Sequence, residues 1–227
     1  FNEGEGSISY PVSNTDITNI TLHNTRWSQG APFKAMVPPL IEEEKMLRIG
    51  LISDPQYCDC NEGPNRKYRL SLQKLPKAID TLNLHEVNFT VTLGDVIDRQ
   101  FSSYDSILPL YGALENPYYF VLGNHEFDQV EDSLKDEILN RLNMPDYFYS
   151  HEYAGWKFLF LDGTEMAEYS GILHPELFEE ADSMRQKVAG WINDYEWNGG
   201  FSRNQLFWIE QELSQSMEYN QHVILFC

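Results

Sequence analysis

The 227-residue sequence predicts an α/β fold with a mostly parallel sheet. Three short apolar runs at 46–53, 87–93 and 118–122 are rich in β-branched and aromatic residues, as expected of buried strands. Stretches with apolar residues at helical spacing separate them, over 68–83 and after Ser103. A repeated strand–helix–strand order implies parallel strands joined by right-handed crossovers.

Each predicted helix has one apolar face. In the stretch 68–83 this face holds Leu72, Leu75, Ile79 and Leu82. Pro76 lies inside the same stretch, removes one helix hydrogen bond and is expected to kink it. Ser103 is expected to cap the second helix, and the buried residues of that helix are Ile107, Leu108, Tyr111 and Leu114. A third helix over 131–142 has the stripe Leu134, Ile138 and Leu142.

The pattern changes in the second half of the chain. Strands at 147–153 and 156–161 flank Ala154-Gly155, which is typical of a hairpin. Residues 163–198 form a long irregular insertion rich in Glu, Tyr and Trp. Long loops inside a compact domain are often functional, so the insertion is a candidate part of a binding site.

The chain is predicted to hold one domain preceded by an arm. Residues 1–45 are polar and interrupted by prolines, so we expect an irregular N-terminal arm. The domain spans 46–227 and closes on a buried strand at 222–227. Ser202 and Gln205 form a capping box before that strand, and they open a helix with the inward residues Leu206, Ile209 and Leu213.

Composition excludes several classes of partner. A net charge of −19 opposes binding to nucleic acid or to an anionic membrane. No apolar run is long enough for a transmembrane helix. The charge does not oppose a phosphate substrate, because divalent metals can supply positive charge locally. We therefore expect a small-molecule phosphate substrate, with no nucleic-acid or membrane partner.

The three cysteines do not indicate a site. Cys58, Cys60 and Cys227 are an odd, sparse set, which predicts no disulfide framework. No further Cys or His pair stands at zinc-site spacing from Cys58 and Cys60, so we expect these two to be structural or incidental.

Polar side chains follow three of the predicted strands. Asp54-Pro55-Gln56 follows the first, Gly94-Asp95-Val96-Ile97-Asp98 the second and Gly123-Asn124-His125-Glu126 the third. One Gly-Asp or Gly-Asn pair after a strand is usually only a turn. Three strand ends that supply Asp, Gln, Asp, Asn and His together are hard to assign to turns, and they predict a metal site.

A two-metal hydrolase needs a carboxylate that bridges both ions, which then generate a hydroxide for in-line attack on phosphorus. Asp95 is the natural bridging ligand, because it directly follows the central strand. Asp54 and Gln56 would complete the ligands of one ion, and Asn124 those of the other.

His125 is the candidate catalytic group, because it adjoins the metal ligand Asn124. It can act as a general acid or stabilise charge at the leaving oxygen. Asp98 is expected to accept a hydrogen bond from the His125 ring and so orient it.

These motifs resemble the first three motifs of the calcineurin-like metallophosphoesterase superfamily. Most members have His where Gln56 stands, and Gln56 followed by Tyr57 is similar to one branch, the manganese-dependent ADP-ribose/CDP-alcohol diphosphatases. The stretch at 67–72 and the run at 197–208, which begins Trp-Asn-Gly-Gly-Phe-Ser, are also similar to that branch. The resemblance covers about 47–227.

The resemblance implies a two-sheet α/β sandwich (α-β-β-α) with two divalent metal ions at the strand ends. It implies Mn²⁺, with Fe, Zn or Mg as alternatives, and hydrolysis of a pyrophosphate or phosphoester bond in nucleotide-type substrates such as ADP-ribose. Asp54, Gln56, Asp95 and Asn124 match the metal ligands, and His125 matches the catalytic histidine. The candidates for the substrate side of the site, with the insertion as a lid or nucleoside-binding wall, are Asn198, Gly199 and Gly200.

The sequence departs from this pattern at its C-terminal end. The superfamily places further histidines after a strand like 222–227 and then in a Gly-His-x-His stretch, and none of these is present. We therefore expect the chain to be a fragment that lacks the C-terminal part of the fold. Two alternatives stay open: a phosphomonoesterase or phosphodiesterase with another substrate, and a non-catalytic metal-binding module.

Overall fold

The computed structural model describes residues 46–227, apart from 64, 129, 171–172, 193–194 and 196–197. The unit described below is Leu47–Cys227. The arm predicted over 1–45 lies outside the described residues.

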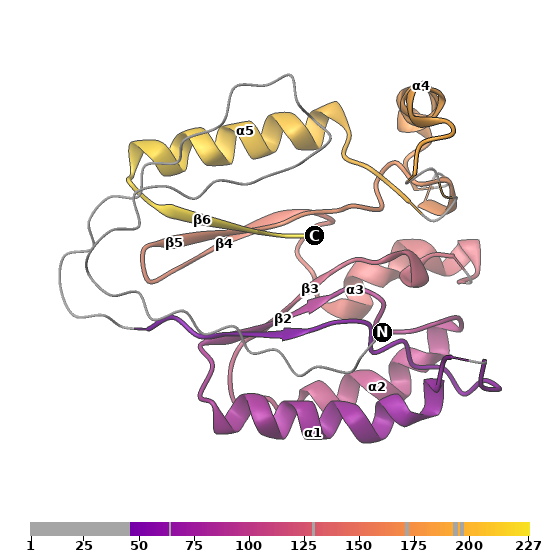
Figure 1. Ribbon diagram of the computed structural model, residues 1–227, viewed down its shortest axis with the longest axis vertical. Coiled ribbons are helices and arrows are strands. Elements are labelled where there is room, and N and C mark those ends of the chain that lie inside the picture. Colours follow the sequence, from indigo (N-terminus) through magenta and orange to yellow (C-terminus); the bar gives the residue numbers. More distant parts are fainter. Residues whose placement is uncertain (1–45, 64, 129, 171–172, 193–194, 196–197) are drawn as a thin grey trace. The chain divides into compact units, whose positions relative to one another are not determined.

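The first sheet of the second unit is entirely parallel. It consists of β1 (Ile49–Ile52), β2 (Phe89–Leu93) and β3 (Tyr118–Val121), in that order. The helices α1 (Ser71–Leu84) and α2 (Tyr104–Tyr111) connect these strands and cover one face of the sheet (Figure 1). The β-α-β-α-β order predicted a parallel sheet, and this prediction is confirmed.

The second sheet consists of β4 (Tyr149–Tyr153), β5 (Trp156–Phe160) and β6 (His222–Phe226). β4 and β5 form the predicted antiparallel hairpin, and β6 pairs with β5 in parallel. The helix α5 (Arg203–Glu218) lies along the outer face of this sheet (Figure 1). The layers are helices, sheet, sheet and helix, which confirms the predicted α-β-β-α sandwich.

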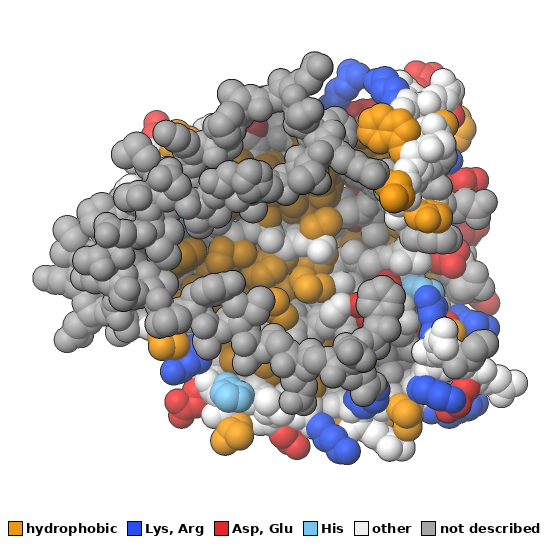
Figure 2. All heavy atoms as spheres, in the orientation of Figure 1, with side chains coloured by type: hydrophobic (Ala, Val, Ile, Leu, Met, Phe, Trp, Pro, Cys, Tyr) orange, Lys and Arg blue, Asp and Glu red, His pale blue; other side chains and the backbone are white. Residues whose placement is uncertain are grey.

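Two apolar cores hold these layers together. One lies between the first sheet and its helices and includes Ile79, Ile107 and Tyr111. The other lies between the sheets, and its buried members are Phe89, Val91, Val121, Phe158, Phe160 and Phe226. Because β2 is covered on both faces, its whole length is apolar or Thr rather than alternating with charged residues. Figure 2 shows hydrophobic side chains gathered over the strands, with most charged ones toward the rim.

The remaining elements are short. Three 3₁₀ turns precede helices or follow strands in the first half: η1 (Tyr68–Leu70), η2 (Phe101–Ser103) and η3 (Asn124–Glu126). The helix predicted over 131–142 is present as η4 (Asp132–Glu137) followed by α3 (Ile138–Leu142). The segment predicted as an irregular insertion contains η5 (Glu168–Ser170), η6 (Pro175–Leu177) and α4 (Phe178–Val188).

Several local expectations were wrong. Ser103 is helical and makes no capping bond, because η2 leads directly into α2. Leu206 is 49% exposed, and the fully buried side chains of α5 are Gln205 and Ser216 instead. The two cysteines of the first polar loop, Cys58 and Cys60, form a disulfide. Their Cα atoms lie 5.2 Å apart, within the range that a disulfide spans.

Within the described part of the chain, no helix has the length and apolar character needed to cross a bilayer.

A buried lysine attaches α5 to the second sheet. Lys157 on β5 is 2% exposed, and its ammonium donates to Glu212 at 2.8 Å and to Gln215 at 2.7 Å, both on α5. The charge is therefore satisfied inside the layer, and the contact also fixes how α5 lies along the sheet.

Lys157→Ala should lower the free energy of unfolding by about 3 kcal/mol, because it leaves Glu212 without its cation in a poorly solvated place. The double variant Lys157→Met, Glu212→Leu should return to within about 1 kcal/mol of the wild type. Urea unfolding followed by circular dichroism measures both. Arg185→Ala breaks the exposed pair with Glu168 and serves as the control, with an expected loss below about 1 kcal/mol. Equal losses for Lys157→Ala and Arg185→Ala would contradict this account.

Candidate metal centre

The carboxyl ends of β1, β2 and β3 deliver the predicted metal ligands to one edge of the sheet. Asp54 follows the end of β1, Asp95 follows β2 and Asn124 follows β3. The strands are parallel and in register, so the three loops leave the sheet beside one another. Ligand sites in open α/β sheets form at such edges.

Three of the predicted ligands adopt a left-handed backbone conformation. The φ angles are 50° for Asp54, 42° for Gln56 and 52° for Asp95. This region costs a non-glycine residue roughly 1–3 kcal/mol, and such residues cluster at functional sites. The surrounding contacts must therefore hold the three residues in place.

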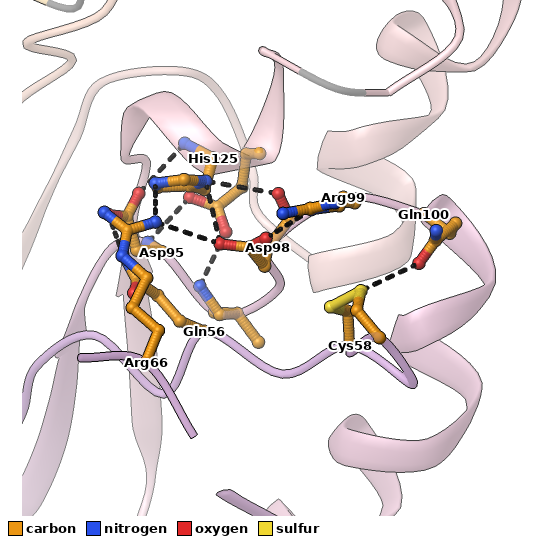
Figure 3. A network of polar contacts seen from close by, with 11 residues as sticks. Gln56, Cys58, Arg66, Asp95, Asp98, Arg99, Gln100 and His125 are labelled. Atoms are coloured by element: carbon orange, nitrogen blue, oxygen red, sulfur yellow. Dashed lines mark hydrogen bonds and ion pairs between the residues drawn. A yellow bond between two sulfur atoms is a disulfide. The ribbon is translucent and has the colours of Figure 1, made fainter. Parts of the chain in front are cut away.

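The loops after β1 and β2 are bonded along their length. The backbone N–H of Gln56 donates to the Asp95 carbonyl at 2.7 Å, and Asp98 N–H donates to the Tyr57 carbonyl at 3.0 Å. The Gln56 side-chain amide also donates to the Asp95 carboxylate at 3.0 Å (Figure 3). Because the amide nitrogen makes this bond, the amide oxygen of Gln56 is available as a metal ligand.

A buried glutamate joins the loop after β2 to the loop after β3. Glu126 accepts backbone N–H bonds from Asp95 at 2.8 Å, Val96 at 2.7 Å and Gly123 at 2.8 Å. Burial raises the pKa of Glu126 to about 8, the Asp95 carboxylate adds to the rise, and the three backbone bonds oppose it. This role of Glu126 was not predicted from the sequence, although its place in the third motif was the available signal.

Two glycines allow these loops to approach closely. A Cβ on Gly94, whose φ is +78°, would lie 2.6 Å from the backbone nitrogen of Gly123. A Cβ on Gly123 would overlap the carboxylate of Asp95. The same carboxylate accepts the backbone N–H of His125 at 3.0 Å. Asp95 is thus held from both neighbouring loops.

The His125 ring lies against Asp98. Its Nδ1 is 3.1 Å from the Asp98 carbonyl oxygen and 3.3 Å from Asp98 Oδ1 (Figure 3). These two acceptors favour a proton on Nδ1 and turn Nε2 outward, where it meets Arg66 Nη1 at 3.3 Å. Asp98 is 2% exposed and also pairs with Arg66 at 3.2 Å and Arg99 at 2.9 Å.

The donor set suits a divalent cation. Asp95 is 9% exposed and lies next to the buried acid Glu126, so the two carboxyl groups repel one another. A cation at Asp95 would remove that repulsion. Asp54 is exposed after the end of β1 and accepts the Ser53 hydroxyl. The Asn124 carbonyl accepts the backbone N–H groups of Phe127 and Asp128, the two residues after η3. Carboxylate and amide oxygens from these loops fit a hard divalent ion.

The residues predicted on the substrate side lie at the end of β5. A Cβ on Gly199 would overlap the Gly163 carbonyl oxygen, so these two backbones are in close contact. Just beyond, Glu165 accepts the backbone N–H of Ser202 at 3.0 Å and its hydroxyl at 2.8 Å. The position of Asn198 and Gly200 is set by this attachment, because they flank Gly199 in the chain.

The helix α5 begins with half of the predicted capping box. The Ser202 hydroxyl accepts the backbone N–H of Gln205 at 3.1 Å, as predicted. The Gln205 side chain instead bonds both backbone groups of Asp162, at 2.9 and 3.0 Å, and the carboxylate of Glu165 at 2.6 Å. Glu165 therefore takes the capping role that the sequence analysis gave to Gln205.

Tyr169 brings the insertion next to Phe127, two residues beyond His125. The Tyr169 ring stacks on Phe127, with centroids 6.3 Å apart, and its carbonyl accepts from Lys135 at 2.9 Å. Burial raises the pKa of Tyr169, and the nearby carboxylates of Asp162 and Asp95 add to the rise. Tyr169 was not predicted from the sequence, because a tyrosine in a long loop carries no spacing signal.

Comparison with known proteins identifies the family. A sequence model of calcineurin-like phosphoesterases matches residues 47–225. The chain belongs to this family of hydrolases.

Similar proteins in this family include two named manganese-dependent ADP-ribose/CDP-alcohol diphosphatase. The one from Arabidopsis thaliana is 24% identical, over 80% of this chain and 67% of its own. The one from Homo sapiens is 25% identical, over 80% of this chain and 66% of its own. A crystal structure of a dimetal phosphatase from Danio rerio has a TM-score of 0.65 and 25% identity, and the match covers 79% of this chain and 68% of that one. The chain thus spans about two thirds of the length of these relatives.

Gly123→Ala should displace the Asp95 carboxylate, because the new methyl group would occupy its place. We expect the affinity for Mn²⁺ to fall about 10- to 100-fold, as happens when groups that orient a metal ligand are changed. Calorimetric titration of chelator-treated protein with Mn²⁺ measures this. Gly63→Ala is the matched control, since its methyl group would meet only Arg66 Cβ, at 3.8 Å. A folded Gly123→Ala protein with wild-type Mn²⁺ affinity would refute the account.

Asp162→Asn should alter the pH dependence of stability. Burial raises the pKa of Asp162 from 3.8 to about 6, opposed by the bonds that Oδ1 accepts from Thr164. An acid with a raised folded-state pKa binds its proton more tightly when folded, so its favourable contribution is full below pH 4 and is lost as pH rises through 6.

The difference across this range is about 3 kcal/mol. Asn keeps the oxygen that Thr164 needs, so Asp162→Asn should be more stable than the wild type at pH 7.5 and lose this advantage below pH 4. Urea unfolding between pH 4 and 8 tests the trend, with Asp80→Asn on the exposed side of α1 as the control. Parallel pH profiles for wild type and Asp162→Asn would disprove it.

Proposed function

We propose that the protein is a two-metal phosphohydrolase that cleaves a pyrophosphate or phosphoester bond in nucleotide-type substrates, ADP-ribose and CDP-alcohols among them. The observation that carries this proposal is the Asp95 carboxylate, held between the Gln56 amide and the His125 backbone where three strand ends meet. The family supports a phosphoester substrate, and the names of the similar proteins support the diphosphate substrates.

Four residues would hold the two ions. Asp95 would bridge them, Asp54 and Gln56 would complete one ligand set, and Asn124 would contribute to the other. When bound, the ions supply positive charge for the phosphoryl group and lower the pKa of water at the site. We propose Mn²⁺, because the similar diphosphatases are named for it; Fe, Zn and Mg remain alternatives with the same donors.

His125 would act on the leaving oxygen. The carbonyl oxygen and Oδ1 of Asp98 both lie next to His125 Nδ1, so the ring is oriented with Nε2 toward the open side of the site. Nε2 is the atom that would hold and then deliver a proton to the departing group. Asp98 is a positioning residue in this scheme, since it acts on substrate only through the histidine.

The substrate side would be formed by Asn198, Gly199, Gly200 and the insertion. Contact between Gly199 and Gly163 joins this segment to the end of β5, and Tyr169 joins the insertion to Phe127, two residues beyond His125. The described part of the insertion also contains a cavity of about 200 Å³. Its lining combines apolar side chains, Leu177 and Phe178 among them, with the charged or polar side chains of Glu165, Glu168, His174, Asp182 and Arg185.

Asp95→Ala in the full-length protein should abolish Mn²⁺-dependent release of AMP from ADP-ribose, with a loss of at least about 1000-fold, and should reduce bound metal. His125→Ala should lower kcat about 100- to 10,000-fold while metal is retained. Coupled assay of AMP and elemental analysis measure the two effects. His85→Ala, at the exposed end of α1, is the control and should keep wild-type activity.

A substrate panel separates the alternatives. ADP-ribose, CDP-choline, cyclic nucleotides and p-nitrophenyl phosphate would be compared at equal concentration. Preference for the last two would favour a phosphodiesterase or phosphomonoesterase. Protein that holds no metal and turns over none of them would favour a non-catalytic module. An Asp95→Ala protein that keeps its metal and releases AMP at an unchanged rate would contradict the proposed mechanism.

A further inference from the structure

Arg66 occupies the position where a substrate would meet His125. Its Nη1 lies 3.3 Å from His125 Nε2 and 3.2 Å from Asp98 Oδ1 (Figure 3). The His125 side chain is 12% exposed and the Arg66 side chain 48% exposed. The guanidinium therefore lies at the open side of the histidine, on the atom that would contact a leaving group.

Three other cations lie close to Arg66 in the chain or at the site, and each is engaged elsewhere. Lys67 pairs with Glu62, and Arg69 pairs with Asp59. Arg99 binds the second oxygen of Asp98 and lies over the Tyr68 ring, 5.7 Å from its centroid. Of these four cations, Arg66 is the one in contact with the histidine. Its half-exposed guanidinium supplies a local positive charge that can attract a phosphate group despite the net charge of −19.

The release of Arg66 from this position would leave no buried charge unpaired. Asp98 Oδ2 would keep Arg99 at 2.9 Å, and Oδ1 would keep His125 Nδ1 at 3.3 Å. The backbone of Arg66 is fixed, since its carbonyl accepts from Gly63 at 3.1 Å. The Arg66 side chain can thus exchange its contacts with His125 and Asp98 for a contact with a phosphate anion at low cost. This exchange leaves His125 Nε2 free.

We propose that Arg66 is a substrate-binding residue that leaves His125 when substrate arrives and binds the phosphate next to the one attacked. This inference rests on the proposed function. In a pyrophosphate the leaving group is itself a phosphate, whose oxygens would lie where Nε2 and Nη1 both point. The guanidinium fork matches a phosphate in shape and charge. A nitrophenyl monoester offers no anion at this place, so Arg66 selects diphosphates over monoesters.

Kinetics of Arg66→Ala, Arg66→Lys and Lys67→Ala in the metal-loaded full-length protein test this. Arg66→Ala should raise KM for ADP-ribose about 10- to 100-fold, the loss expected for a hydrogen bond to a charged group. Arg66→Lys should recover part of this, because it keeps the charge without the fork. Lys67→Ala removes the adjacent charge without touching His125 and should change KM less than about threefold. The kcat/KM for p-nitrophenyl phosphate should stay within about threefold for all three variants.

Binding of inorganic pyrophosphate, measured by calorimetry against inorganic phosphate, gives a second readout without turnover. We expect Arg66→Ala to weaken pyrophosphate binding at least about 10-fold and phosphate binding much less. Equal losses in Arg66→Ala and Lys67→Ala would show a general charge effect and overturn the proposal. Equal losses for pyrophosphate and phosphate would do the same. A wild type that hydrolyses only monoesters would refute the proposed function, and the pyrophosphate titration would still decide the role of Arg66.

Discussion

The candidate metal centre depends on the buried carboxyl group of Glu126. It binds backbone N–H groups from two loops that are about thirty residues apart in sequence, and it does so in a place without solvent. This bond set helps to compensate the strain of the left-handed backbone at Asp95, together with the bonds that Asp95 accepts from Gln56 and His125. Gly94 can contact the Gly123 backbone because it has no Cβ, and the Asp95 carboxylate can lie against Gly123 for the same reason. Glu126 and the two glycines thus determine the backbone conformation of Asp95 and the position of its carboxylate.

This arrangement has an electrostatic consequence. Glu126 and Asp95 are neighbouring acids in a poorly solvated place, and the protein accommodates them with a raised pKa on Glu126. Natural proteins keep such unfavourable pairs mainly where function requires them. The cores on either side of the first sheet supply the stability that the site lacks. A cation at Asp95 would offset the repulsion between the two acids, while Glu126 keeps its backbone bonds.

Sequence alone predicted the strands and their ends well, because short apolar runs stopped by polar residues reflect burial directly. The parallel order followed from the alternation of strands and helices. The Cys58–Cys60 bond was not predicted, since its formation depends on a local bend that spacing does not report. The helix α4 was missed because it has no buried residue among those described, and so no apolar stripe to detect. Contacts such as Arg66 with His125 join residues 59 apart, and no local pattern encodes them.

A buried glutamate anchors a loop at the end of each of the two sheets. After β3, Glu126 ties neighbouring loops through backbone N–H groups; after β5, Glu165 ties the loop to the start of α5 through Ser202 and Gln205. In each case a buried carboxyl group accepts several donors, so the loop gains rigidity without a long apolar segment. The second network fixes the segment that holds Gly199 against the end of β5. A site assembled from loops can be precise when each loop is anchored in this way, and here both candidate sides of the site have such an anchor.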